Sequence, residues 1–94
     1  MLKIERTSQF KRDYKRELKG RHKKTLENDL KEVLMSLVQR EPLEEKYKDH
    51  ALTGNWKDHR DCHIKPDLVL IYRIPEGDEV LRLTRLGSHS ELGT

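Results

Sequence analysis

Apolar residues are scarce in this chain, but their regular spacing limits what it can fold into. Hydrophobic residues make up 33% of its 94 residues and charged residues 39%, a balance that alone leans toward disorder. The spacing argues for folding, because Phe10, Tyr14 and Leu18 recur every four residues, as on one buried face of a helix. We therefore expect one marginally stable domain that covers residues 1–94.

Two helices are predicted in the first half of the chain. Thr7 or Ser8 can cap the first helix, and Gly20 supplies the left-handed residue that ends it. The second helix is expected from about residue 22 to about residue 39, before Pro42. The two should pack as an antiparallel hairpin. The apolar face of the second helix comprises Leu26, Leu30, Val33, Leu34 and Leu37.

Four strands are predicted around this helix pair. Residues 41–47 are polar and predict a loop. The segment LVLIYRI, residues 68–74, is the most apolar in the chain and is expected to be the central strand. The order β-α-α-β-β-β predicts an α+β fold, with the helix pair on one face of a mainly antiparallel sheet and the other face open. The expected strands are residues 2–6, about 55–64, 68–74 and 79–86, with turns at Pro66–Asp67 and Pro75–Asp78.

Composition and charge exclude several classes of protein. The net charge of +3, from 20 basic and 17 acidic residues, permits a nucleic-acid partner without requiring one. The single cysteine, Cys62, rules out a disulfide framework and is expected to be a small buried hydrophobe. No apolar run approaches the roughly 18 residues of a membrane span, and the N-terminal segment lacks the apolar centre of a signal peptide. We therefore expect a cytoplasmic protein without a membrane partner.

Histidine is concentrated in the second half of the chain. On the strand expected at about residues 55–64, alternation places Trp56 and Cys62 toward the helices and His63 on the open face. Three histidines and an aspartate could therefore converge on one open surface. They are His50, before this strand, His63 within it, Asp67 after it, and His89 after the last strand.

Three interpretations of this cluster are open on the residues alone. A zinc site is disfavoured, because His59 and His63 lie four residues apart on a strand, which separates them by about 13 Å. In the second, RNA is cut without a metal: histidines deprotonate the 2′-hydroxyl and protonate the departing 5′-oxygen, and Asp67 supports one of them. In the third, the histidines are solvated surface groups without a function. Candidate cations for the phosphate are Lys57, Arg73, Arg82 and Arg85.

Three segments resemble the RelE/YafQ toxins of bacterial toxin–antitoxin pairs, the YafQ branch in particular. They are FKRDYKR at residues 10–16, YKDHALTGNWKDHRDCHIKPDLVLIYRI at 47–74 and LTRLGSHSEL at 83–92. The resemblance implies a ribonuclease that needs no metal or cofactor and cuts messenger RNA in the ribosomal A site. It also implies a DinJ-like antitoxin that neutralises the toxin. Operator DNA would be bound only through the toxin–antitoxin complex.

The same resemblance assigns roles to individual residues. It implies that Arg85 stabilises the phosphate and that the catalytic residues are His50, His63, Asp67 and His89. We expect His89 to protonate the leaving oxygen, and either His50 or His63, with Asp67, to act on the 2′-hydroxyl. Strict alternation would instead turn Arg85 to the buried side, so either a bulge or the end of the strand rotates it into the site, or Arg82 takes the role. The match to the family motif favours Arg85.

Two positions depart from the family pattern. Gly93–Thr94 stand where YafQ chains commonly end in an aromatic residue, and Leu68 stands where relatives can carry an aromatic after the aspartate. Both departures bear on base stacking and therefore on codon preference. The basic first helix is expected to contact ribosomal RNA, unless it is simply a solvated face. The alternative functions are a non-catalytic RNA- or protein-binding module and a zinc-dependent nuclease.

Overall fold

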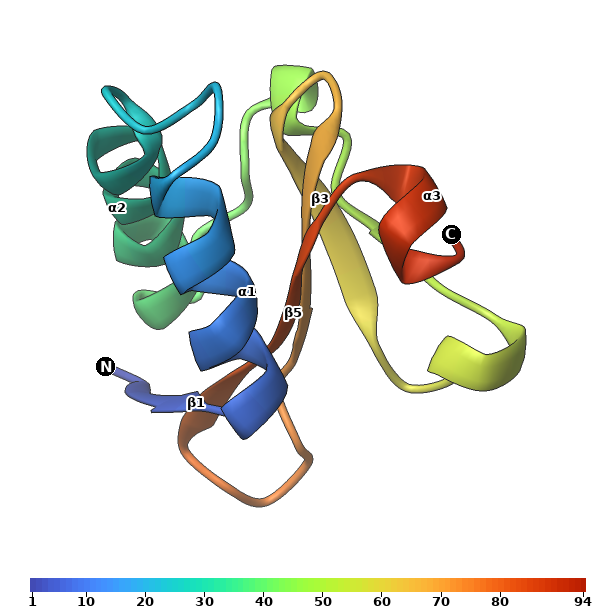
Figure 1. Cartoon of the computed structure of the whole chain (residues 1–94). Helices are drawn as coiled ribbons and strands as arrows, with labels where there is room; N and C mark the ends of the chain where they lie inside the picture. The colour runs from blue at the N-terminus through green and yellow to red at the C-terminus, as the bar shows by residue number, and fades with distance from the viewer.

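A computed structural model describes all residues from Met1 to Thr94. A twisted sheet runs through the middle of the molecule, with two long helices on one side and a short third helix on the other (Figure 1). The elements are β1 (Lys3–Arg6), α1 (Ser8–Leu18), α2 (Leu26–Val38), β2 (His50–Ala51), β3 (Arg60–Lys65), β4 (Leu68–Arg73), β5 (Val80–Gly87) and α3 (His89–Leu92), with 3₁₀ turns η1 (Glu45–Tyr47) and η2 (Gly54–Trp56).

The sheet has five strands in the order β1-β5-β4-β3-β2. β1 runs parallel to β5, and the other three pairs are antiparallel. β4 lies in the middle, where its apolar sequence favours burial against strands on both sides. The predicted α+β class, the mainly antiparallel sheet and the central strand are therefore confirmed.

The helix pair covers one face of the sheet with the main hydrophobic core. α1 begins at Thr7, whose hydroxyl accepts a hydrogen bond from the amide of Phe10 at 3.0 Å. Phe10 is buried together with the apolar stripe of α2. Leu2, just before β1, and the helix-facing side of the central strands contribute the rest of this core; the strand residues are Cys62, Ile64, Leu68, Leu70, Tyr72, Leu81, Leu83 and Leu86.

Several predicted boundaries are wrong, because turns interrupt segments that were expected to be regular. α2 begins at Leu26, after a run of turns at residues 21–25, and the loop at 41–47 contains η1. The strand expected from residue 55 begins at Arg60. Gly54 and Asp58 adopt positive φ values of 67° and 70°, which an extended strand cannot contain. The short elements β2 and α3 were not predicted.

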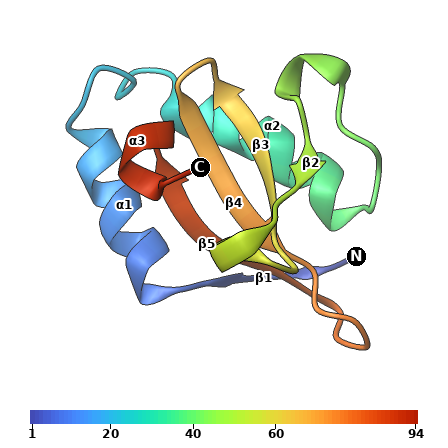
Figure 2. The ribbon, with the colours of Figure 1, turned by 90° about the vertical axis from the view of Figure 1, so that its right-hand side faces the viewer.

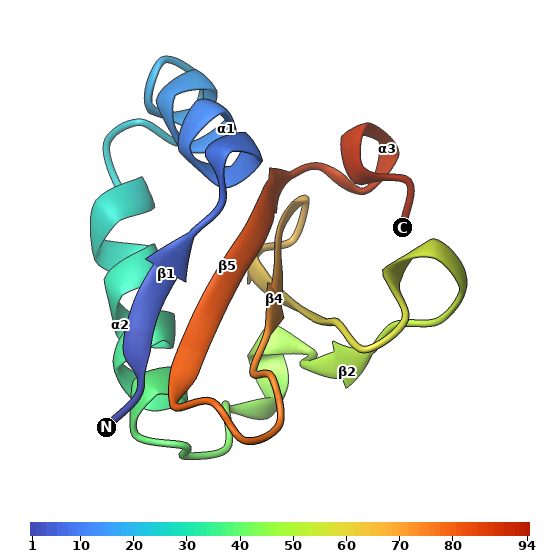
Figure 3. The ribbon, with the colours of Figure 1, turned by 90° about the horizontal axis from the view of Figure 1, so that it is seen from below.

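The second face of the sheet is not open, contrary to the prediction. Val69 and Ile71 of β4 are fully buried there under Leu92 of α3, with Leu52 and Trp56 packed against them. Figures 2 and 3 show α3 and the segment after β2 on the side of the sheet opposite α1 and α2. Trp56 therefore does not face the helix pair, because it belongs to η2 rather than to a strand.

None of the helices combines the length and the apolar character needed to cross a bilayer.

Candidate active site

The second face of the sheet carries a row of ionisable side chains beside its small core. Asp61 and His63 lie two residues apart on β3 and therefore point to the same side. They pair across the ladder with Ile71 and Val69, the two residues that β4 buries on that face. His50 on β2 pairs directly with Asp61. Strand register thus places His50, Asp61 and His63 side by side.

His50 is oriented by its own loop. Its Nδ1 lies 2.8 Å from the carbonyl oxygen of Lys48, which can only accept a hydrogen bond. Nδ1 therefore carries a proton, and the neutral ring exposes a lone pair on Nε2. The same Nδ1 lies 3.0 Å from Oδ1 of Asp61, an ion-pair distance without hydrogen-bond alignment. The side chain of His50 is 54% exposed, so Nε2 is open to a substrate.

Asp61 is a buried carboxylate under the imidazoles. The residue is 1% exposed, and burial raises its pKa, while the nearby charges of His50, His63 and His89 oppose that rise. A buried carboxylate of this kind stabilises a protonated imidazole that forms beside it. Alternation along the strand expected at about residues 55–64 also puts Asp61 on the same side as His63. The sequence interpretation nevertheless did not include Asp61 in the site.

His63 and His89 contact each other through their rings. The centroids lie 4.8 Å apart with an interplanar angle of 62°, an edge-to-face contact. Burial is the main cause that lowers the pKa of His63, followed by the charge of His89. Asp61 acts in the opposite direction, but the net shift is downward. His63 is therefore neutral at pH 7.

Asp67 lies beside His89 rather than beside His63. It comes from the tight turn between β3 and β4, and its Oδ1 is 3.6 Å from Nδ1 of His89. Its other carboxylate oxygen is 3.4 Å from Nη2 of Arg21, in the connection between the two long helices. The structure therefore joins Asp67 to His89, a different pairing from the one predicted.

α3 is held in place by contacts at both of its ends. Ser88 caps its start: its hydroxyl accepts from the amide of Glu91, whose carboxylate accepts from the amide of Ser88. The indole Nε1 of Trp56 donates to the carbonyl of Leu92 at 3.2 Å. These contacts fix His89, the first residue of α3, over the sheet.

Arg85 reaches the site face through a β-bulge, one of the alternatives left open by the sequence. Ile71 pairs with Arg85, but Tyr72 pairs with Leu83, so Thr84 is the extra residue. The bulge turns Arg85 to the side of Ile71. Thr7 secures it, since its hydroxyl donates to the carbonyl of Thr84 at 2.7 Å.

The guanidinium of Arg85 is directed toward α1. Its Nε and Nη2 donate to the two carboxylate oxygens of Asp13 at 2.8 and 3.2 Å. None of the hydrogen bonds or ion pairs of Arg85 involves the three histidines. Arg82 is the less suitable cation, because it lies toward the other end of β5 and pairs with Glu5 at 2.6 Å.

Asp13 is the second buried carboxylate, and the sequence interpretation missed it. It is 3% exposed and also accepts from the amide of Leu86 at 3.0 Å. Burial alone would raise its pKa, but the hydrogen bonds from Arg85 and from the Leu86 amide, with the charges of Arg85 and Arg16, hold it below the usual value. An acidic residue three positions after Phe10 lies on the buried side of α1, and this spacing was the available signal.

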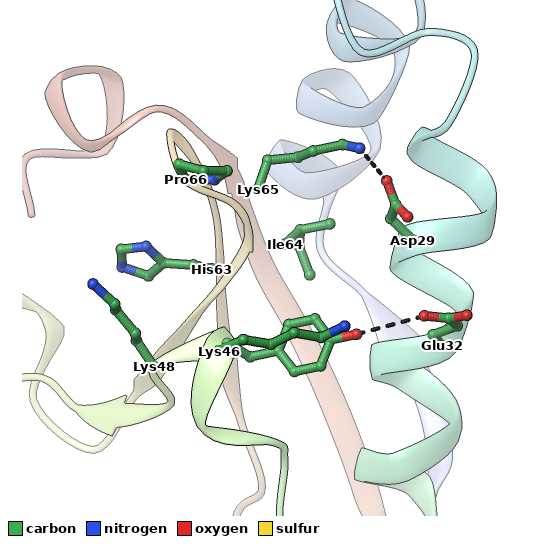
Figure 4. A pocket seen from close by; sticks show the side chains of 9 residues that line it. Asp29, Glu32, Lys46, Lys48, His63, Ile64, Lys65 and Pro66 are labelled. Atoms are coloured by element: carbon green, nitrogen blue, oxygen red, sulfur yellow. Dashed lines mark hydrogen bonds and ion pairs between the residues drawn. The ribbon is translucent and has the colours of Figure 1, made fainter.

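A cavity of about 420 Å³ adjoins the histidine row, and both His63 and residues that face α2 line it. Figure 4 shows His63 and Lys48 on one side of this strand, and Ile64, Lys65, Asp29 and Glu32 toward α2 on the other. No group of three or more histidine, cysteine, aspartate or glutamate side chains is arranged to hold a metal ion. His59 in particular contacts Trp56 rather than His63.

Comparison with known proteins is consistent with this architecture. A family model described as "Bacterial toxin of type II toxin-antitoxin system, YafQ" matches residues 2–94. The chain therefore belongs to the YafQ family of toxins, as its sequence resemblance indicated.

Its relatives include proteins with named activities and partners. The mRNA interferase toxin YafQ of Escherichia coli K12 is 42% identical over 90 residues, which are 95% of this chain and 92% of that protein. A metal-bound toxin from Helicobacter pylori is 45% identical with a TM-score of 0.82, and the match covers 98% of this chain and 99% of that one. YafQ in the E. coli DinJ–YafQ complex superimposes with a TM-score of 0.79 and 34% identity over the whole of both chains.

Proposed function

We propose that this protein is the toxin of a type II toxin–antitoxin pair and an mRNA endoribonuclease that acts in the ribosomal A site and thereby inhibits translation. The observation that supports this most directly is the row formed by His50, His63 and His89, with carboxylates beside two of them. Such a row supplies imidazoles that can act as a base, as an acid and as a neutral hydrogen-bond donor to the phosphate. The E. coli relative named an mRNA interferase supports the choice of substrate.

His50 is the proposed general base. Its Nε2 is free because Nδ1 donates to the Lys48 carbonyl. As Nε2 takes the proton from the ribose 2′-hydroxyl, the ring becomes positively charged, and Asp61 at 3.0 Å stabilises that charge. The 2′-oxygen then attacks the adjacent phosphorus.

His89 is the proposed general acid. His50 lies level with Asp61, and His89 contacts His63 two residues further along β3, so base and acid are offset by about 7 Å along the strand, in addition to their separation across it. This spacing suits an in-line displacement, in which the attacking and leaving oxygens lie on opposite sides of phosphorus. His89 protonates the departing 5′-oxygen as the P–O5′ bond breaks, which leaves a 2′,3′-cyclic phosphate and a 5′-hydroxyl. Asp67, 3.6 Å from Nδ1 of His89, is placed to orient the ring of the acid.

His63 and Arg85 are proposed to act on the phosphate itself. His63 lies between the base and the acid, and its lowered pKa keeps it neutral, so its ring can donate a hydrogen bond to a phosphate oxygen. Arg85 uses Nε and Nη2 on Asp13, which leaves Nη1 without a protein partner. Its side chain is 22% exposed, so Nη1 is the group that would meet the growing negative charge.

The ribosome and the antitoxin are the proposed partners. The exposed basic side chains of α1 and of its C-cap suit ribosomal RNA phosphates, because Lys11, Arg12, Lys15 and Lys19 form no ion pair within the protein. A DinJ-like antitoxin is proposed because the E. coli relative is found in a complex with DinJ. Operator DNA would then be bound by the antitoxin part of that complex.

Mapping the 5′ ends of cellular transcripts after brief induction tests this proposal. Ribosome-dependent cutting predicts ends that fall in frame with codons and vanish when ribosomes are blocked. His89→Ala should remove the ends and the growth arrest while the protein still binds its antitoxin. Growth arrest that persists in this variant would indicate a binding module without chemistry.

Two further assays test the acid role of His89 and the absence of a metal from the reaction. His89→Ala should recover part of its activity on a substrate with an activated 5′-leaving group, because such a group needs no proton. A lack of recovery would argue against the acid role. Since the related H. pylori toxin is described as metal-bound, cleavage should also be measured with EDTA. Loss of cleavage in EDTA would contradict the metal-free mechanism.

A further inference from the structure

The proposed site lacks a cation whose charge is fully available to the phosphate. Arg85 is paired with a buried carboxylate, so much of its charge is already compensated. The pentacoordinate state formed by attack of the 2′-oxygen carries more negative charge than the starting diester. An uncompensated cation near His63 would therefore add stabilisation that the histidines do not supply.

Lys48 meets that requirement by position. It is exposed, lies just before β2, and forms no ion pair within the protein. Its side chain points to the same side of β3 as His63, with its amine beside the imidazole ring (Figure 4). Lys48 and His63 line the same cavity, and the positive charge of Lys48 helps to lower the pKa of His63.

The backbone at Lys48 is held rigidly by its neighbours. Lys48 adopts a left-handed conformation with φ of 48° at the end of η1. The next residue, Asp49, accepts hydrogen bonds from Arg60 at 3.2 and 3.3 Å and from the buried hydroxyl of Tyr72. The carbonyl of Lys48 meanwhile orients His50. One anchored loop residue thus presents its carbonyl to the base and its side chain to the centre of the histidine row.

We propose that Lys48 is a further catalytic residue, whose ammonium group binds a non-bridging oxygen of the scissile phosphate and stabilises the pentacoordinate state. This inference rests on the proposed ribonuclease function. Lys48 and Arg85 would then contact the phosphate from the two sides of the row, one through an unpaired charge and the other through Nη1. No proton transfer by Lys48 is required.

The other lysines of the cavity offer a matched contrast. Nζ of Lys46 lies 3.9 Å from a carboxylate oxygen of Glu44 and 5.1 Å from the centre of the Tyr47 ring. Lys65 is paired with Asp29 of α2. Both are committed to contacts within the protein, so Lys46 serves as the control for removal of a nearby positive charge.

The test is single-turnover cleavage on programmed ribosomes at saturating toxin. Lys48→Asn removes the charge with a residue that tolerates the left-handed backbone, and it should cut about 100- to 1000-fold more slowly. Lys48→Arg should recover most of that rate, and Lys46→Asn should stay within about 2-fold of wild type. If wild type itself does not cut, the proposed function fails. If wild type and Lys48→Asn cut equally well, only this inference fails.

A phosphorothioate substrate distinguishes contact with the phosphate from an effect on folding. Sulfur in place of the oxygen bound by Lys48 should slow wild type strongly and Lys48→Asn much less, because the contact is already lost in the variant. An equal sulfur effect in both proteins, for each of the two diastereomers, would overturn the direct role. The melting curve and the antitoxin binding of Lys48→Asn should match those of wild type. A slower cleavage rate in this variant would then result from the lost charge and not from a folding defect.

Discussion

The two faces of the sheet come from alternate residues of the same strands, yet they are stabilised in different ways. The helix-facing side buries a cluster of 15 hydrophobic residues and needs few polar contacts. The other side has a core of only three buried hydrophobic residues, Val69, Ile71 and Leu92, and places His50, Asp61 and His63 next to them. The small core cannot position these groups by packing alone. Their orientation depends on specific hydrogen bonds.

Those hydrogen bonds connect segments that are distant in sequence. Trp56 holds the end of α3, Asp49 holds the loop before β2, and Asp13 holds the end of β5. Each contact joins a polar side chain to a backbone group or to a buried partner, which fixes a direction as well as a distance. The comparison therefore predicts that damage to the helix-facing side lowers stability, whereas damage to the other side also lowers activity.

The largest effect is expected from His50→Ala, which removes function without disturbing either core. Loss of the general base should slow ribosomal cleavage about 1000-fold. The side chain is largely exposed, so the midpoint of urea unfolding should change little. A large drop in that midpoint would show that His50 is a structural residue instead.

The next largest effect is expected from alanine substitutions at two neighbouring residues of β4, one on each face of the sheet. Leu70 points to the helices and Ile71 to the site, and both are fully buried. Replacement of either by alanine should lower the free energy of unfolding by about 3 kcal/mol. At a temperature where both variants are folded, only Ile71→Ala should also cut more slowly. Equal activity in the two variants would contradict the division of roles between the faces.

Asp13→Asn should cost about 2 kcal/mol at pH 7, because Arg85 and the Leu86 amide lose their charged acceptor. The lowered pKa of Asp13 means that its contribution is complete above its unfolded pKa, near 3.9, and is lost as the pH falls through the folded value. Wild type and variant should therefore converge in stability in strong acid. Parallel curves from pH 7 to pH 2, measured by urea unfolding, would exclude this linkage.

The smallest effect is expected from Trp56→Phe. Phenylalanine keeps most of the packing on Val69 and Ile71 but loses the hydrogen bond to the carbonyl of Leu92. We expect about 1 kcal/mol of destabilisation. Hydrogen exchange of the α3 amides should rise more than that of β4, and an even rise across the sheet would argue against a local role for the indole.

Much of the fold could be predicted because its signals are local. The four-residue spacing in α1 and the apolar run of β4 depend only on near neighbours, and both elements appear where expected. The closed second face was missed, although β4 is apolar at every position from Leu68 to Tyr72. An apolar run of this kind is typical of a strand buried on both faces, and that signal was available.

The candidate site was predictable in its residue types but not in its pairings. Sequence alone identified His50, His63, Asp67 and His89, and the structure places them on one face. It did not show that Asp67 lies beside His89, or that Asp61 lies under the row, because both depend on how turns and strands are placed relative to one another.

What the sequence determined by itself was the two long helices, the four longer strands with the central one among them, and the histidines able to exchange protons, since these follow from side-chain chemistry and local periodicity. Only the tertiary structure decided that Thr84 forms a bulge, that Arg85 turns to Asp13, and that His89 meets His63. The physical reason is the range of the contacts. Thr7 and Thr84 are 77 residues apart, and Asp13 and Arg85 are 72 apart, so they meet only once the sheet has formed.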